Sequence, residues 1–337
     1  MANLKSEYLG ISLKNPVIVG ASNLVTDLDT LKKMEDAGAA AIVYKSLFEE
    51  QIQLENLQLS EEMDEYKERN AEMISLFPEV EHAGPEEHLM NLRKAKESVG
   101  IPLIASLNAV YDVTWVEYAK LIEGTGVDAI ELNFYATPKD FSKEGTSIVN
   151  EQLKVIKEVK KNVSIPLSVK LSSFYTNILK VIKMMDEAGA NGFVIFNRLF
   201  QPDINIENET HHFPYNLSNV EDNRLPLRFA GLLHGNINAS ICCNGGIFDG
   251  ADVIKMLLVG ADCVQVVSTL YKNKIGHLEK ILSDVQDWMK RKDYGSIEDF
   301  KGKLSKKNIK DPFTYKRAQY VDILMNSEEI FKKYPMY

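Results

Sequence analysis

Two lysines of this chain follow short apolar runs, where a folded protein normally places hydrocarbon. Lys45 comes after Ala-Ile-Val-Tyr, and Lys170 comes after Leu-Ser-Val. Burying a lysine costs several kcal/mol unless its ammonium group meets an anion or a hydrogen-bond acceptor. Two interpretations stay open: a structural ion pair with a buried carboxylate such as Glu131, or a cation that faces an anionic cofactor or substrate.

A pair of glycines and a pair of hydroxyl residues indicate phosphate binding. The sequence NGGI at 244–247 ends one apolar run, and Ser268 and Thr269 end the next. The backbone N–H groups of a Gly-Gly pair, together with the start of a short helix, form a common phosphate site in α/β barrels. We therefore expect a phosphorylated ligand, either a nucleotide cofactor or a sugar phosphate.

Polar residues stand at the end of nearly every apolar run. Each one alone is explained as a helix N-cap or a strand-end hydrogen-bonding group. In a barrel of parallel strands, however, the carboxyl ends of the strands together form the catalytic rim. The set comprises Ser22, Lys45, Ser46, Asn108, Asn133, Lys170, Asn197, Asn244, Ser268 and Thr269.

Eight apolar runs alternate with stretches of helical spacing, which predicts an α/β fold, a (β/α)8 TIM barrel. The runs are Pro16–Ser22, Ala40–Ser46, Pro102–Asn108, Ala129–Tyr135, Pro166–Ser172, Gly192–Asn197, Ala239–Gly246 and Cys263–Thr269. Four similar phrases, DAGAAAIV, GTGVDAIE, EAGANGFV and LVGADCVQ, each predict a helix end, a reversing glycine and a strand. An open doubly wound sheet is the alternative, but its Gly-rich first turn is replaced here by GASN.

Two long connections are expected to form insertions over the catalytic face. Leu47–Gly84 follows the second predicted strand, and Arg198–Val220 follows the sixth. The latter holds His211 and His212, for which we expect surface positions, with a role in the pocket as the alternative. We expect residues 1–305 to form the barrel and residues 306–337 to form a helical C-terminal tail.

Composition excludes several classes of function. The 337 residues carry a formal net charge of −9, which argues against a nucleic-acid partner. No apolar run reaches the roughly 18 residues of a membrane span, and the first residues lack a signal peptide's apolar stretch. We therefore expect a cytoplasmic protein without a membrane partner. The three cysteines have no metal-site spacing, so we expect no metal and small buried side chains.

Together these motifs resemble the dihydroorotate dehydrogenase family, the FMN barrels of pyrimidine synthesis, over about residues 3–305. LKNPVIVGAS resembles the family's N-terminal segment, VYKS and IPLSVKLS its two lysine motifs, and IELN the segment before its catalytic loop. NGGI…DGADVIKMLLVGAD…Q…ST resembles its phosphate-binding end. The class 1 branch is the most similar, which implies a homodimer, a small-molecule substrate and a second electron acceptor.

The resemblance implies which residues bind FMN. They are Ala21, Ser22, Lys45, Ser46, Asn108, Asn133, Lys170, Asn197, Ser218, Asn244, Gly245, Gly246, Ser268 and Thr269. Lys45 would be catalytic, between flavin and substrate. Lys170 would face the flavin N1–O2 edge, where a cation stabilises the anionic reduced flavin. Asn133 and Asn197 would also bind substrate.

The resemblance also implies a catalytic base. In the family, a Cys or Ser directly before Pro takes a proton from C5 while C6 gives a hydride to flavin N5. The loop reads NFYATPK at 133–139, so an ungapped match places Ala136 at the base position and one inserted residue places Thr137 there. We expect Thr137 to be the base and Lys139 to contact an anionic substrate.

The function implied by the resemblance is oxidation of dihydroorotate to orotate in pyrimidine biosynthesis. One alternative is an FMN oxidoreductase for another pyrimidine-like or small unsaturated ring, because Glu79 stands where the family has a substrate-binding Asn and would repel a carboxylate. A non-catalytic flavin-binding relative and a sugar-phosphate lyase or isomerase are two more. No iron–sulfur motif or NAD fingerprint identifies the electron acceptor.

Overall fold

Eight parallel strands close into a barrel in the computed structural model, which describes residues 2–49, 52, 85–134, 141–198, 202–212, 217–316, 321, 324–325 and 328–333. In chain order the strands are β3 (Val17–Val19), β4 (Ala41–Phe48), β5 (Leu103–Asn108), β6 (Ala129–Phe134), β7 (Leu167–Leu171), β8 (Gly192–Ile195), β11 (Ser240–Asn244) and β12 (Cys263–Val266). The first strand pairs with both the second and the last, so the sheet has no edge. Each predicted run coincides with one of these strands, although β4 extends two residues beyond its run, and this confirms the barrel and excludes the open sheet.

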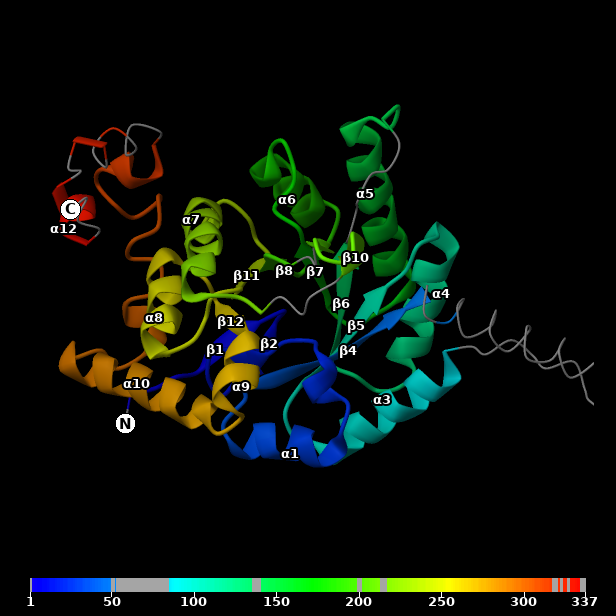
Figure 1. Cartoon of the computed structure of the whole chain (residues 1–337). Coiled ribbons are helices and arrows are strands. Elements are labelled where there is room, and N and C mark those ends of the chain that lie inside the picture. The colour runs from blue at the N-terminus through cyan, green and yellow to red at the C-terminus, as the bar shows by residue number, and fades with distance from the viewer. Residues whose placement is uncertain are drawn as a thin grey trace, which may run out of the picture.

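Helices surround the barrel and cover its outer face (Figure 1). They are α1 (Leu28–Asp36), α3 (Glu86–Ser98), α4 (Asp112–Glu123), α5 (Gly145–Asn162), α6 (Ile178–Glu187), α7 (Arg224–Leu233), α8 (Gly250–Val259), α9 (Ser268–Asn273) and α10 (His277–Arg291). The reversing glycines act as predicted. Gly260, for example, has a φ of 108° and donates its N–H to the last carbonyls of α8, which ends that helix.

The barrel interior is filled from its amino-terminal end. A hairpin of β1 (Ser6–Tyr8) and β2 (Ile11–Leu13) places Tyr8 and Leu9 there, and the Tyr8 hydroxyl lies 2.6 Å from Ser168 Oγ. Gly192 provides the space, because a Cβ at this position would lie 2.5 Å from a Leu9 methyl group. The three cysteines are buried and free, as predicted. Side chains therefore fill the amino-terminal end of the barrel, and space for a ligand remains at the carboxyl end.

The connection after β8 contains a hairpin of β9 (Asp203–Asn205) and β10 (Thr210–His212). His211 and His212 are exposed on it, as expected, and neither lines the cavity described below. Most of the predicted insertion after the second strand, residues 53–84, lies outside the described residues.

Short helical turns follow α10: η3 (Ile297–Asp299), η4 (Pro312–Tyr315) and α12 (Glu328–Lys333). Tyr315 packs against Gly231 of α7, and its hydroxyl donates a 2.6 Å hydrogen bond to the carbonyl of Leu304. This part of the tail is thereby held against the barrel. Among the described helices, none is long and apolar enough to cross a membrane.

Candidate functional site

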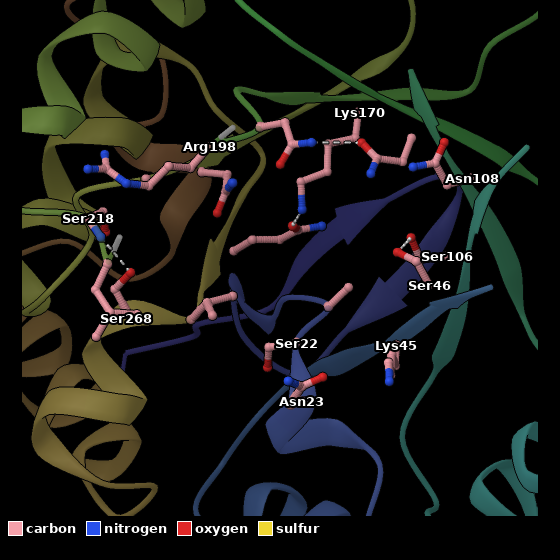
Figure 2. Close-up of a pocket in the computed structure, with 18 of the residues that line it drawn as sticks. Ser22, Asn23, Lys45, Ser46, Ser106, Asn108, Lys170, Arg198, Ser218 and Ser268 are labelled. Atoms are coloured by element: carbon pink, nitrogen blue, oxygen red, sulfur yellow. Dashed lines mark hydrogen bonds between the residues drawn. The ribbon is translucent and has the colours of Figure 1, made fainter. Parts of the chain in front are cut away.

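A cavity of about 450 Å3 opens at the carboxyl end of the barrel strands (Figure 2). The residues predicted to bind a cofactor come together in it, with the exception of Thr269. Those that line it are Ala21, Ser22, Lys45, Ser46, Asn108, Asn133, Lys170, Asn197, Ser218, Asn244, Gly245, Gly246 and Ser268. Two further predictions, Thr137 and Lys139, lie outside the described residues.

Lys170 forms the ion pair with Glu131 that one interpretation predicted, and its side chain also lines the cavity. Its ammonium lies 3.5 Å from Glu131 Oε1 and donates a 3.2 Å hydrogen bond to Gln265 Oε1. Gln265 Nε2 in turn donates a 2.6 Å hydrogen bond to the other Glu131 oxygen. All three side chains are buried, yet Lys170 and Gln265 line the cavity. The lysine is thus paired with a carboxylate and still available to a ligand.

Three asparagines form the part of the rim next to Lys170. Asn197 Nδ2 donates a 2.9 Å hydrogen bond to Asn133 Oδ1, and Asn244 Nδ2 donates a 2.8 Å bond to the carbonyl of Phe196. The bond to the Phe196 carbonyl fixes the orientation of the Asn244 amide, because a carbonyl only accepts, and in the Asn133–Asn197 pair one amide accepts and the other donates. Asn133 keeps an amide donor for a ligand, whereas Asn197 and Asn244 each keep a carbonyl acceptor. The rim therefore offers both kinds of partner to a polar ring.

A second group of residues comes from β4, β5 and the turn after β3. Ser46 Oγ and Ser106 Oγ lie 2.7 Å apart in the cavity wall. Ser22 Oγ accepts the N–H of Leu24 and begins the turn η1 (Asn23–Val25), so the N-cap explanation holds for this residue as well. Figure 2 shows the lysine of β4, Lys45, on this side of the cavity with Ser22 and Ser46.

Lys45 also acts on a neighbouring histidine. The pKa of His88, on α3, is lowered to about 4 by burial and by the positive charge of Lys45. His88 packs edge-on against Tyr44, with ring centroids 5.6 Å apart. The imidazole is therefore neutral at pH 7 and packs against Tyr44 of β4 as an uncharged ring.

The predicted phosphate end is built from three connections. Ser218 N–H donates a 2.9 Å hydrogen bond to Ser268 Oγ, and Gly246 N–H donates a 3.3 Å bond to Ser218 Oγ. Gly246 has a φ of 71°, and a Cβ there would lie 2.3 Å from the backbone nitrogen of Asn223, so only glycine fits. Thr269 is buried instead and donates its hydroxyl hydrogen bond to the carbonyl of Phe248.

Several lining residues were not predicted: Asn23, Phe48, Ser106, Arg198, Leu217, Ile247, Gln265 and Val267. Arg198 lies at the phosphate end in Figure 2, near Ser218 and Ser268, and pairs with Asp222. The signal that singled out Lys170, a polar residue inside an apolar run, applies equally to Ser106 and Gln265. Arg198 follows Asn197 directly and carried no comparable signal.

Hydroxyl groups and glycine N–H donors at one end and a lysine with three amides at the other are the donor set for a phosphorylated ligand with a polar ring. The cavity has the volume of a typical small-ligand site, about 300–1,000 Å3. Gly245 leaves room for such a ligand, since a Cβ there would meet no atom of the described chain within 4 Å. Within the described residues no group of three or more His, Cys, Asp or Glu side chains is placed to hold a metal. The fold and site thus define a (β/α)8 barrel with a polar cavity at the carboxyl ends of its strands.

Comparison with known proteins identifies the family. The profile of the dihydroorotate dehydrogenase family matches residues 3–289, so the chain belongs to this family, which is flavin-dependent. It is 27% identical to dihydroorotate dehydrogenase B (NAD(+)), catalytic subunit, of Thermoplasma volcanium, over 90% of this chain and 98% of the relative. It is 26% identical to the protein of the same name from Methanocaldococcus jannaschii, over 85% of this chain and 94% of the relative.

A relative with a different printed activity also aligns. The chloroplastic dihydropyrimidine dehydrogenase (NADP(+)) of Arabidopsis thaliana is 23% identical over 87% of this chain and 75% of the relative. The predicted membership of the dihydroorotate dehydrogenase family is confirmed.

Proposed function

We propose that this chain is an FMN-dependent oxidoreductase that converts dihydroorotate to orotate and passes the electrons to a second acceptor. The observation that carries the proposal is the position of Lys170, a buried cation at the floor of a cavity whose other end has hydroxyl groups and glycine N–H donors. FMN needs both, because its phosphate is an anion and its ring becomes anionic on reduction. When bound, FMN accepts the hydride in this chemistry.

Different lining residues bind the phosphate and the ring of FMN. Ser218, Ser268 and the Gly245–Gly246 segment bind the phosphate, with the Gly246 N–H holding Ser218 Oγ in place, and Arg198, paired with Asp222, lies at that end. Ala21, Ser22, Ser46 and Asn108 line the opposite side and lie against the ring. The buried floor excludes water from the reacting edge, which strengthens every charge interaction there.

The substrate half of the site lies above this floor. Asn133 donates and Asn197 accepts hydrogen bonds from a polar ring, and Lys45 supplies the positive charge that attracts the substrate carboxylate. Thr137 takes the C5 proton as base, and Lys139 contacts the substrate anion. Both follow Asn133, a residue of β6, within six residues in the sequence.

We place the enzyme in the cytoplasm, as a homodimer in which residues 1–305 form the flavin barrel and residues 306–337 a tail. The relatives named as catalytic subunits support a further partner subunit that receives the electrons. Copurification from the native host would test the partner, and light scattering coupled to size-exclusion chromatography would test the dimer.

A second substrate class is supported by one observation. Arabidopsis dihydropyrimidine dehydrogenase aligns over most of this chain, and the sequence at 135–140 departs from the family's Cys/Ser-Pro-Asn pattern. An oxidoreductase for another dihydropyrimidine would keep the same FMN-binding residues and differ only in the residues that bind the substrate.

Anaerobic titration of the flavin tests both proposed substrate classes. The purified protein should be yellow, and dihydroorotate should bleach the flavin absorbance with one orotate formed per flavin. Bleaching by another dihydropyrimidine, with none by dihydroorotate, would replace the first substrate with the second. A flavin that no dihydropyrimidine reduces would identify a non-catalytic relative, and a colourless protein that does not take up FMN would overturn the proposal.

A further inference from the structure

Glu131 and Gln265 are joined across the barrel. Glu131 is on β6 and Gln265 on β12, and these strands are four places apart in the ring of eight, on opposite walls. Their 2.6 Å hydrogen bond therefore spans the interior. Glu131 is fully buried and does not line the cavity, so it reaches a ligand there through its charge and through its contacts with Gln265 and Lys170.

The carboxylate fixes how Gln265 presents its amide. Gln265 donates to Glu131 through Nε2 and accepts from Lys170 through Oε1. The reversed amide would set an NH2 group against the ammonium and a carbonyl against the carboxylate, and both contacts are repulsive. Without Glu131, only the Lys170 contact would hold the amide.

The same carboxylate reduces the positive electrostatic field that Lys170 produces in the cavity. The ammonium lies between Glu131 Oε1, 3.5 Å away, and Gln265 Oε1, 3.2 Å away. Within the described chain Glu131 Oε1 receives no hydrogen bond. In a buried site the attraction between unit charges at this separation is much stronger than in water. The negative charge of Glu131 therefore cancels part of the positive field of Lys170 at the cavity floor.

We propose that Glu131 is a positioning residue that holds Lys170 and Gln265 against the flavin ring and sets the flavin's reduction potential below the value that Lys170 alone would give. The proposal rests on the proposed flavin site. An anionic reduced ring is stabilised by Lys170 and opposed by Glu131, and the lysine lies on the cavity side of the pair. The groups therefore act in opposite directions and with unequal strength.

Spectroelectrochemical titration of the FMN-loaded protein against a reference dye tests this assignment. Glu131→Gln keeps the side-chain shape and removes the charge, so the potential should rise. A tenfold shift of the two-electron equilibrium, about 30 mV, is the expected order of magnitude. The double variant Glu131→Gln/Lys170→Gln should fall below the wild type, because the stronger of the two charges is lost as well.

Matched variants separate charge from packing. Tyr8→Phe removes another buried hydrogen bond inside the same barrel, changes no charge, and should leave the potential unchanged. Glu131→Asp keeps the charge but withdraws it from Lys170, so it should raise the potential by less than Glu131→Gln. If Glu131→Gln does not fold, Glu131→Asp still tests the effect of the Glu131 charge on the potential.

The outcomes are distinguishable. Potentials of the Glu131 variants equal to the wild type, or shifted equally by Tyr8→Phe, would overturn the positioning role and leave the proposed function intact. A wild-type protein that takes up no FMN would overturn the proposed function itself.

Discussion

Asn197 Nδ2 donates a 2.9 Å hydrogen bond to Asn133 Oδ1, which ties the end of β8 to the end of β6 across the intervening strand β7. The bond leaves one amide with donors and the other with an acceptor facing the cavity. Each amide therefore supports the orientation of the other, and the predictions begin from this pair.

Replacing Asn133 with Asp should weaken binding of an anionic ring. The carboxylate still accepts the Asn197 hydrogen bond, but the donor becomes a negative charge. Loss of a hydrogen bond to a charged group costs about 1.5–3 kcal/mol, so the substrate concentration for half-maximal flavin reduction should rise at least tenfold. Stopped-flow reduction of the FMN-loaded variant measures this. Asn197→Ala is the comparison: it breaks the pair without adding charge, and a larger rise for it than for Asn133→Asp would contradict the prediction.

The two glycines of the phosphate end should respond differently to alanine. Gly245→Ala meets only the cost of a positive φ, about 1–2 kcal/mol. Gly246→Ala adds a clash with the Asn223 backbone, and overpacking of this kind costs roughly 1–3 kcal/mol more. Urea denaturation of the flavin-free proteins gives both free energies of unfolding. Equal losses would show that the Asn223 turn moves aside.

Thr137→Ala should abolish flavin reduction by dihydroorotate and leave FMN content unchanged, because a methyl group takes no proton. Thr137→Ser keeps the hydroxyl and should retain activity. Single-turnover anaerobic reduction separates the two variants. An unchanged rate in Thr137→Ala would remove this residue from the mechanism.

Stability should fall below neutral pH in a way that depends on His88. Its pKa is lowered from 6.5 to about 4 by burial and the Lys45 charge, so between these values the unfolded state binds the proton and the folded state does not. The contribution is therefore present above pH 6.5 and lost as pH falls toward 4; linkage gives a loss of about 2 kcal/mol between pH 7 and pH 5.

Denaturation of the wild type and of His88→Gln at these two pH values checks the effect. The variant should lack this part of the pH dependence. The same slope in both proteins would mean that other groups cause it.

Strand positions were predictable because a buried parallel strand must be apolar on both faces, and each predicted run holds a strand. The lysines stood out for the same reason, as charges inside apolar runs. Arg198 and Ser106 were missed, since Arg198 follows a strand end like many surface arginines and a single serine in a strand is common. The roles of Thr137 and Lys139 stay predictions, because both lie outside the described residues.

The sequence by itself determined the barrel, its reversing glycines and the polar rim, because these depend on local periodicity and on residues close along the chain. Only the tertiary structure decided which charges meet. Glu131 and Lys170 lie on neighbouring strands, but Gln265 is 134 positions from Glu131, and only closure of the sheet brings it within hydrogen-bond distance of both. From the sequence alone, an ion pair with a carboxylate and a position facing a ligand are two alternative interpretations of such a lysine. In the closed barrel Lys170 pairs with Glu131 and also lines the cavity.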